Sequence, residues 1–86
     1  MNNQKKYELK FTKNFLDKYR KGIDKSQQKI IDKKILELEE NPKKGKPLFS
    51  ISPNLYELYA NSYRIYYLIL HKEIRIILLA YEHKNN

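Results

Sequence analysis

The stretch that decides the fold is residues 55–81, LYELYANSYRIYYLILHKEIRIILLAY, which is rich in β-branched and aromatic residues. Two short polar sequences, NS and HKE, divide it into three apolar segments, residues 55–60, 63–70 and 74–81. Apolar segments of this length, joined by such short connections, are typical of consecutive antiparallel strands. The stretch therefore predicts three strands that follow one another in the sheet.

Upstream of these strands the pattern changes. Residues 7–11 alternate apolar and charged side chains, which predicts one further strand. Two helices are predicted next, over residues 13–19 and residues 24–40, because a threonine and an aspartate that can serve as N-caps precede apolar residues at helical spacing. The sequence NPKKGKP that follows, residues 41–47, is typical of a loop.

The predicted order is β-α-α-β-β-β, an α+β fold of two layers in which two N-terminal helices pack on a small antiparallel sheet. A chain of 86 residues has room for one core, and we expect residues 1–86 to form a single domain. The last two strands are apolar on both faces, whereas two short helices can cover only one face. Either loops and the N-terminal segment cover the second face, or part of it is exposed and indicates a protein partner.

Composition excludes several classes of function. The chain has no cysteine, so it has no disulfide framework, no thiolate zinc cluster and no cysteine nucleophile. No apolar run approaches the roughly 18 residues that a transmembrane helix needs, and the start, MNNQKK, lacks the apolar core of a signal peptide. We therefore expect a soluble, cytoplasmic protein with no metal, no small-molecule cofactor and no membrane partner.

Positive charge is concentrated in the first half of the chain. The whole sequence has 18 lysines and arginines against 10 acidic residues, a formal net charge of +8. Residues 1–46 account for +7 of this charge and residues 47–86 for +1. A one-sided positive field attracts polyanions, among which nucleic acid is the leading class. The alternative is a surface that is basic only for solubility.

Residues 45–69, GKPLFSISPNLYELYANSYRIYYLI, and residues 75–84, RIILLAYEHK, resemble the RelE/ParE superfamily of toxins from type II toxin-antitoxin systems. The shared elements are a Gly-Lys-Pro-Leu loop, a Leu-Tyr-Glu-Leu strand, a Tyr-Arg-aliphatic-x-Tyr strand and a C-terminal element like Gly-His-Arg. That element reads Glu-His-Lys at residues 82–84. The resemblance, to the RelE-like mRNA interferase branch, implies a toxin that inhibits translation by ribosome-dependent endonucleolytic cleavage of mRNA. It also implies a cognate antitoxin that holds the toxin silent.

The resemblance implies four catalytic residues, Arg64, His83, Lys84 and Glu57. Attack of a ribose 2′-hydroxyl on the adjacent phosphate needs a base, a cation for the phosphorane charge and an acid for the leaving oxygen, without a metal. Arg64 would hold the phosphate, because a planar guanidinium suits that role. His83 and Lys84 stand where the family has its C-terminal histidine and arginine, and Glu57 would act as the base or orient Arg64.

RNA contacts are expected from the loop before the strands and from tyrosines of the sheet. Lysines supply cations for phosphates, and aromatic rings stack on bases. The six expected residues are Lys43, Lys44, Lys46, Tyr59, Tyr66 and Tyr81. Strand periodicity places Glu57 on the same face as Tyr59, and Arg64 on the same face as Tyr66.

Departures from the family pattern leave alternatives open. Tyr59 stands where many relatives have arginine, Lys84 replaces an arginine, and the sequence ends at Asn86 before the tyrosine that active relatives often carry. One alternative is a catalytically weakened or inactive homologue that only binds antitoxin or nucleic acid. Another is a ParE-like gyrase inhibitor, which shares the fold but needs no ribonuclease residues. Glu57 and Arg64 would then form an ordinary cross-strand ion pair.

Overall fold

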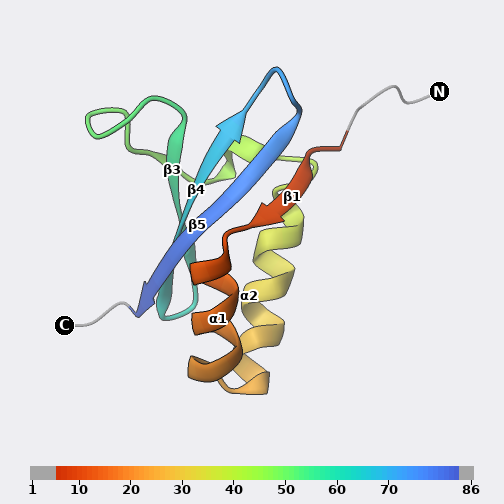
Figure 1. Cartoon of the computed structure of the whole chain (residues 1–86), viewed down its shortest axis with the longest axis vertical. Helices are drawn as coiled ribbons and strands as arrows, with labels where there is room; N and C mark the ends of the chain where they lie inside the picture. Colours follow the sequence, from red (N-terminus) through yellow and green to blue (C-terminus); the bar gives the residue numbers. More distant parts are fainter. Residues whose placement is uncertain (1–5, 84–86) are drawn as a thin grey trace.

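The computed structural model of the chain describes residues 6–83, in which two helices pack against one sheet (Figure 1). Both helices lie on the same side of the sheet, and the other side carries no helix of the described part. The elements in chain order are β1 (Glu8–Phe11), α1 (Lys13–Gly22), α2 (Lys25–Glu37), the short 3₁₀ helix η1 (Pro42–Lys44), β2 (Lys46–Pro47), β3 (Leu55–Ala60), β4 (Tyr63–Leu70) and β5 (Arg75–His83).

The five strands form one sheet in the order β1-β5-β4-β3-β2. The three consecutive strands are confirmed, and β4 pairs antiparallel with both β3 and β5. The prediction of a purely antiparallel sheet is wrong, because β1 pairs with β5 in the parallel direction. The loop prediction also missed β2, whose two residues pair with β3. The pairing of β1 with β5 joins segments 67 residues apart, so no local sequence pattern reports it. Strand β2 has only two residues, too few for a two-residue alternation to be recognised.

Side chains at the predicted caps begin both helices. The Thr12 hydroxyl accepts a hydrogen bond from the backbone nitrogen of Phe15 at 3.1 Å and donates one to the carbonyl oxygen of Leu79 at 2.9 Å. Asp24 accepts a hydrogen bond from the backbone nitrogen of Gln27 at 2.9 Å. Such caps satisfy amide groups that the first helical turn leaves unpaired. The Thr12 bonds also tie the start of α1 to the last strand.

The core lies between the helices and the sheet. Its largest fully buried side chains are Tyr67, Phe15, Ile31, Leu38, Ile65, Ile69, Ile76 and Leu78. Those from β4 and β5 alternate along each strand, so one face of the sheet is turned to the helices. The Arg64 side of β4 is therefore the open face. Within residues 6–83, no helix is long and apolar enough to span a membrane.

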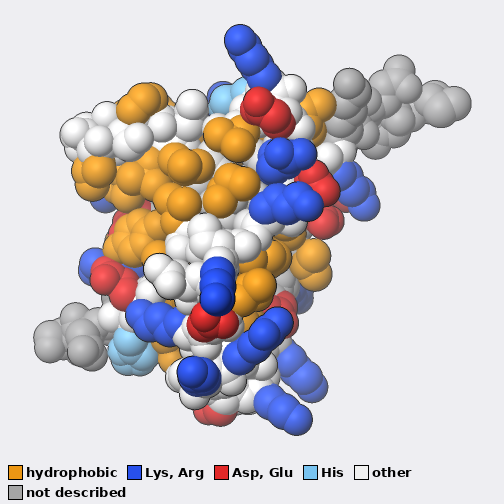
Figure 2. All heavy atoms as spheres, viewed as in Figure 1, with side chains coloured by type: hydrophobic (Ala, Val, Ile, Leu, Met, Phe, Trp, Pro, Cys, Tyr) orange, Lys and Arg blue, Asp and Glu red, His pale blue; other side chains and the backbone are white. Residues whose placement is uncertain are grey.

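The open face is apolar at one end. Leu68 of β4 lies between Leu55 of β3 and Ile77 of β5, and the nearby loop carries the exposed side chains of Phe49 and Ile51. Figure 2 shows hydrophobic side chains gathered over this loop and the adjoining strands. Leu68 and Ile77 are only half-buried in the chain alone. The second apolar face expected from the sequence is thus present, and it suits contact with another protein.

Candidate functional site

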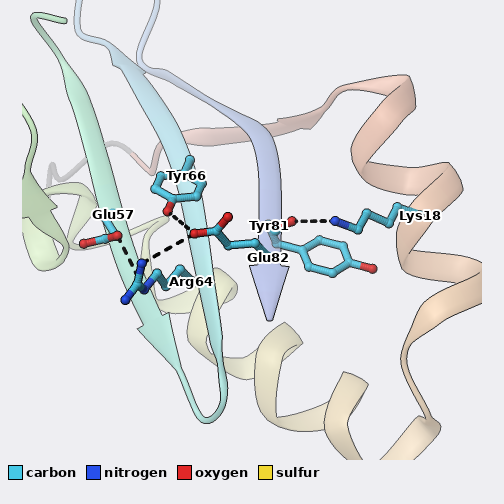
Figure 3. Close-up of polar contacts among 6 residues, drawn as sticks. All are labelled: Lys18, Glu57, Arg64, Tyr66, Tyr81 and Glu82. Atoms are coloured by element: carbon cyan, nitrogen blue, oxygen red, sulfur yellow. Dashed lines mark hydrogen bonds and ion pairs between the residues drawn. The ribbon is translucent and has the colours of Figure 1, made fainter. Parts of the chain in front are cut away.

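Arg64 lies at the centre of a cluster of polar side chains at the other end of the open face (Figure 3). Tyr59 of β3 is directly opposite Arg64, and Glu57 is opposite Tyr66. On the other side, Glu82 of β5 is the register partner of Arg64. Since alternate residues of a strand share a face, all five side chains project from the same face of the sheet. We call these five residues the Arg64 cluster.

Two carboxylates flank the guanidinium. Nη1 of Arg64 lies 3.5 Å from Oε2 of Glu82, and Nε lies 4.0 Å from Oε2 of Glu57. The Tyr66 hydroxyl donates a hydrogen bond of 2.8 Å to the same oxygen of Glu82. The Arg64 guanidinium carbon also lies 5.9 Å from the centre of the Tyr59 ring. Arg64 is therefore held in place by neighbours on both adjoining strands.

The electrostatics of the cluster keep Arg64 charged and Tyr66 protonated. The interaction with Tyr66 raises the pKa of Arg64 and outweighs the opposite effect of burial. Burial, together with the hydrogen bond to Glu82, raises the pKa of Tyr66. Nε of Arg64 is buried and makes no hydrogen bond within residues 6–83. A buried donor without a partner is costly, so an oxyanion that reached this nitrogen would gain binding energy.

The structure does not bring His83 to Arg64. His83 is the register partner of Tyr63, and the two rings contact edge to face with centroids 5.0 Å apart. Tyr63 packs against the core and precedes Arg64 directly, so His83 lies on the helix side of the sheet. Tyr81 also faces the core and is buried, so its ring is not available for the stacking on an RNA base that the sequence predicts. Lys84 lies outside the described residues.

The three loop lysines differ in their surroundings. Lys44 forms an ion pair with Glu37 of α2, and Lys43 is exposed in η1. Lys46 of β2 is the register partner of Glu57, which puts it beside the Arg64 cluster. Of the three, Lys46 is therefore the one placed to add a second cation to the open face. Within residues 6–83 there is no group of three His, Asp or Glu side chains that could hold a metal ion.

Sequence reasoning missed Glu82 as a site residue. The sequence predicts that the last strand ends at residue 81, whereas β5 continues to His83. The two-residue period of the strand then turns the Glu82 carboxylate to the face of Arg64. In the C-terminal element quoted above, this position corresponds to the glycine of Gly-His-Arg. A charged residue at a glycine position is the signal that could have identified Glu82 as a site residue.

The outer edge of β5 is covered by α1. β1 ends at Phe11, which pairs with Leu78, so β5 continues beyond its parallel neighbour. There the ammonium group of Lys18 donates a hydrogen bond of 3.0 Å to the carbonyl oxygen of Tyr81 and lies 4.9 Å from the centre of its ring (Figure 3). Charged side chains at a strand edge hinder pairing with other strands.

Comparison with known families identifies the class of protein as the toxin component of a toxin-antitoxin system. A family model described as the ParE toxin of the type II toxin-antitoxin system parDE matches residues 9–85. The match covers most of the sequence, so the chain belongs to the ParE toxin family of the RelE/ParE superfamily. No match was found among curated protein sequences.

Solved structures show the same fold. A chain of the intact RelBE toxin-antitoxin complex of E. coli matches with a TM-score of 0.80 and 21% identity, over 93% of this chain and 99% of that one. The isolated E. coli RelE toxin gives 0.80 and 20%, over 93% and 86%. A chain of the RelBE2 complex of Mycobacterium tuberculosis gives 0.77 and 20%, over 91% and 98%. The chain therefore has the RelE fold.

Proposed function

We propose that this toxin inhibits translation by ribosome-dependent endonucleolytic cleavage of mRNA, and that Arg64 binds the phosphate that is cleaved. The observation that carries the proposal is the composition of the Arg64 cluster. It combines a permanently charged guanidinium, a buried carboxylate and two tyrosines on one open face. The first half of the chain, with a net charge of +7 over residues 1–46, supports contact with ribosomal RNA.

Four of the five members of the Arg64 cluster fit a role in the reaction. Glu57, beside Arg64, accepts the proton of the attacking 2′-hydroxyl, and Arg64 stabilises the charge of the phosphorane. The Tyr59 ring offers a surface on which a base stacks. Tyr66 is the proton donor that the cluster supplies for the leaving 5′-oxygen. Because its pKa is raised, we expect this protonation, and hence cleavage, to be slow compared with that by a neutral-range acid.

We further propose a cognate antitoxin as the protein partner and the cytoplasm as the location. Two of the similar structures are described as toxin-antitoxin complexes. The apolar end of the open face, which Leu68 and Ile77 line, provides a surface of the kind that protein partners cover. Ribosome, mRNA and antitoxin would all meet the toxin in the cytoplasm, and residues 1–86 would act as one toxin domain.

Induced expression in a bacterial host tests the function, with growth, protein synthesis and DNA synthesis followed in parallel. The variants are Arg64→Ala and a matched control, Arg75→Ala. Arg75 lies on the same face of the sheet, its side chain is 39% exposed against 37% for Arg64, and it is also paired with a carboxylate, that of Glu8 at 3.2 Å. The control therefore removes an equivalent charge outside the cluster.

We expect the wild type and Arg75→Ala to stop protein synthesis first, while Arg64→Ala grows normally. Full toxicity of Arg64→Ala would contradict the role given to Arg64. An early arrest of DNA synthesis, with a DNA-damage response, would instead support a gyrase inhibitor.

A non-cleaving binding module is the second candidate function. The two carboxylates that flank Arg64 and the position of His83 on the opposite face favour it. A toxin homologue of this kind, expressed alone, would not slow bacterial growth and would not cleave mRNA. Arg64→Ala would then have no effect on growth or on mRNA. It would still bind its antitoxin, which co-purification with the product of a neighbouring gene would detect.

A further inference from the structure

The carboxylate of Glu82 lies 3.5 Å from Nη1 of Arg64, on the open face of the sheet. We propose that Glu82 is a built-in competitor for the substrate, so that RNA binds at Arg64 only after this side chain has turned away. The inference rests on the proposed function, since it takes an RNA phosphate as the ligand of Arg64. It assigns Glu82 a restraining role on the toxin rather than a catalytic one.

Glu82 and Arg64 form a loose ion pair. The two residues are register partners on neighbouring strands, and the closest charged atoms are 3.5 Å apart. The shorter contact of this carboxylate is the 2.8 Å hydrogen bond from Tyr66. A phosphate presents oxygens like those of a carboxylate to a guanidinium. Glu82 is therefore held by Tyr66 at a place where it excludes a substrate phosphate.

The two carboxylates of the cluster differ in freedom. The Glu57 side chain is 10% exposed and fixed in the sheet, whereas that of Glu82 is 52% exposed. Glu82 is thus the one that can rotate into solvent without leaving a buried charge unpaired. The carboxylates of Glu57 and Glu82 lie within 4.0 Å of the Arg64 guanidinium and offset its positive charge, which weakens its attraction for an RNA phosphate. When Glu82 departs, Glu57 is the one carboxylate left in the cluster, with Arg64 and Lys46 as its neighbours.

The buried Nε of Arg64 gives the displaced state a further advantage. This nitrogen makes no hydrogen bond within the described residues, and its distance of 4.0 Å from Glu57 is too long for one. A phosphate oxygen that reached this nitrogen after Glu82 had turned away would satisfy the donor, which Glu82 does not. RNA binding and the release of Glu82 are therefore coupled. The free energy needed to turn Glu82 away from Arg64 sets how readily the toxin binds its substrate.

The test is RNA binding by the purified full chain, measured by fluorescence anisotropy with a labelled single-stranded RNA whose 2′-hydroxyls are methylated to prevent cleavage. Glu82→Gln is compared with Glu8→Gln, which removes the same charge from the same face. Glu8 is 54% exposed and paired with Arg75 at 3.2 Å, so it matches Glu82 in exposure and pairing. Circular dichroism and thermal melting check that each variant is folded.

We expect Glu82→Gln to tighten binding about threefold more than Glu8→Gln, the size of effect that exposed ion pairs have. Glutamine at position 82 can still accept the hydrogen bond from Tyr66 and stay beside Arg64. Glu82→Ser is therefore a second variant, because its shorter side chain does not extend to Arg64. The gain should vanish when Arg64→Ala is combined with Glu82→Gln, since the competitor then has nothing to mask.

Two results would overturn the inference in different ways. Equal tightening by Glu8→Gln and by both Glu82 variants would mean that only net charge matters, and Glu82 would not compete at Arg64. In that case a loss of binding in Arg64→Ala would leave the proposed function intact. If Arg64→Ala binds RNA as tightly as the wild type, the phosphate site itself is misplaced, and the proposed function fails together with the role of Glu82.

Discussion

The hydroxyl of Tyr67 accepts a hydrogen bond from the backbone nitrogen of Gly45 at 3.0 Å, and it donates one of 2.7 Å to the carbonyl oxygen of Pro42. Tyr67 is fully buried in β4, so a core side chain fixes both ends of η1 on the sheet. The next residue after Gly45 is Lys46, which pairs with Glu57. The contact therefore sets how the lysine-bearing loop lies beside the Arg64 cluster.

Gly45→Ala should destabilise the fold. A β-carbon at position 45 would lie 2.6 Å from the hydroxyl oxygen of Tyr67 and 2.7 Å from the carbonyl oxygen of Glu57. Overpacking of this kind costs about 1–3 kcal/mol of unfolding free energy, which thermal melting detects as a lowered Tm. Gly22→Ala is the control, because its β-carbon would meet only the Tyr81 hydroxyl, at 3.5 Å. Equal melting of the two variants would contradict this packing.

Tyr67→Phe should change the stability of the protein at alkaline pH. Burial raises the pKa of the Tyr67 hydroxyl from 10.0 to about 12. Since the unfolded chain loses this proton first, the stability that Tyr67 contributes is complete below pH 10 and is lost as the pH rises from 10 to about 12. Urea unfolding across this range should therefore show a shallower decline for Tyr67→Phe than for the wild type. Parallel curves would rule out a buried, protonated Tyr67.

Lys18→Met should make the protein self-associate. The substitution keeps an apolar stem over the Tyr81 ring but removes the amine that covers the Tyr81 carbonyl at the edge of β5. An uncovered strand edge pairs more readily with a second copy. Sedimentation velocity over a concentration series measures the effect. Lys21→Met is the control, since Lys18 and Lys21 both line a groove between α1 and the end of β5. Identical behaviour of the two variants would refute the protective role of Lys18.

The strands that local patterns define were predictable from the sequence. β3 and β4 have the predicted bounds, because alternation and short polar turns are local signals. The ends of the helices were predicted less accurately. α1 runs three residues beyond the predicted end at residue 19. α2 ends at Glu37 instead of residue 40, because the backbone nitrogens of Leu38 and Glu39 bond three residues back.

The candidate site was predictable in part. Strand periodicity correctly placed Glu57 with Tyr59 on one face of β3, and Arg64 with Tyr66 on one face of β4. It could not show that β3 and β4 pair in the register that brings these side chains together, since register depends on the whole sheet. The extension of β5 was also missed, and with it the alternation that turns Glu82 to the open face and the next residue to the other.

Cleavage of a defined mRNA on purified ribosomes with an open A site tests the central claim most directly, because it isolates the chemistry from the host cell. New 5′ ends are mapped with the wild type, Arg64→Ala and Arg75→Ala. The account predicts cleavage by the wild type on ribosomes but not on free mRNA, a loss of about 100-fold or more in Arg64→Ala, and little change in Arg75→Ala. Intact mRNA with the wild type, or undiminished cleavage by Arg64→Ala, would contradict it.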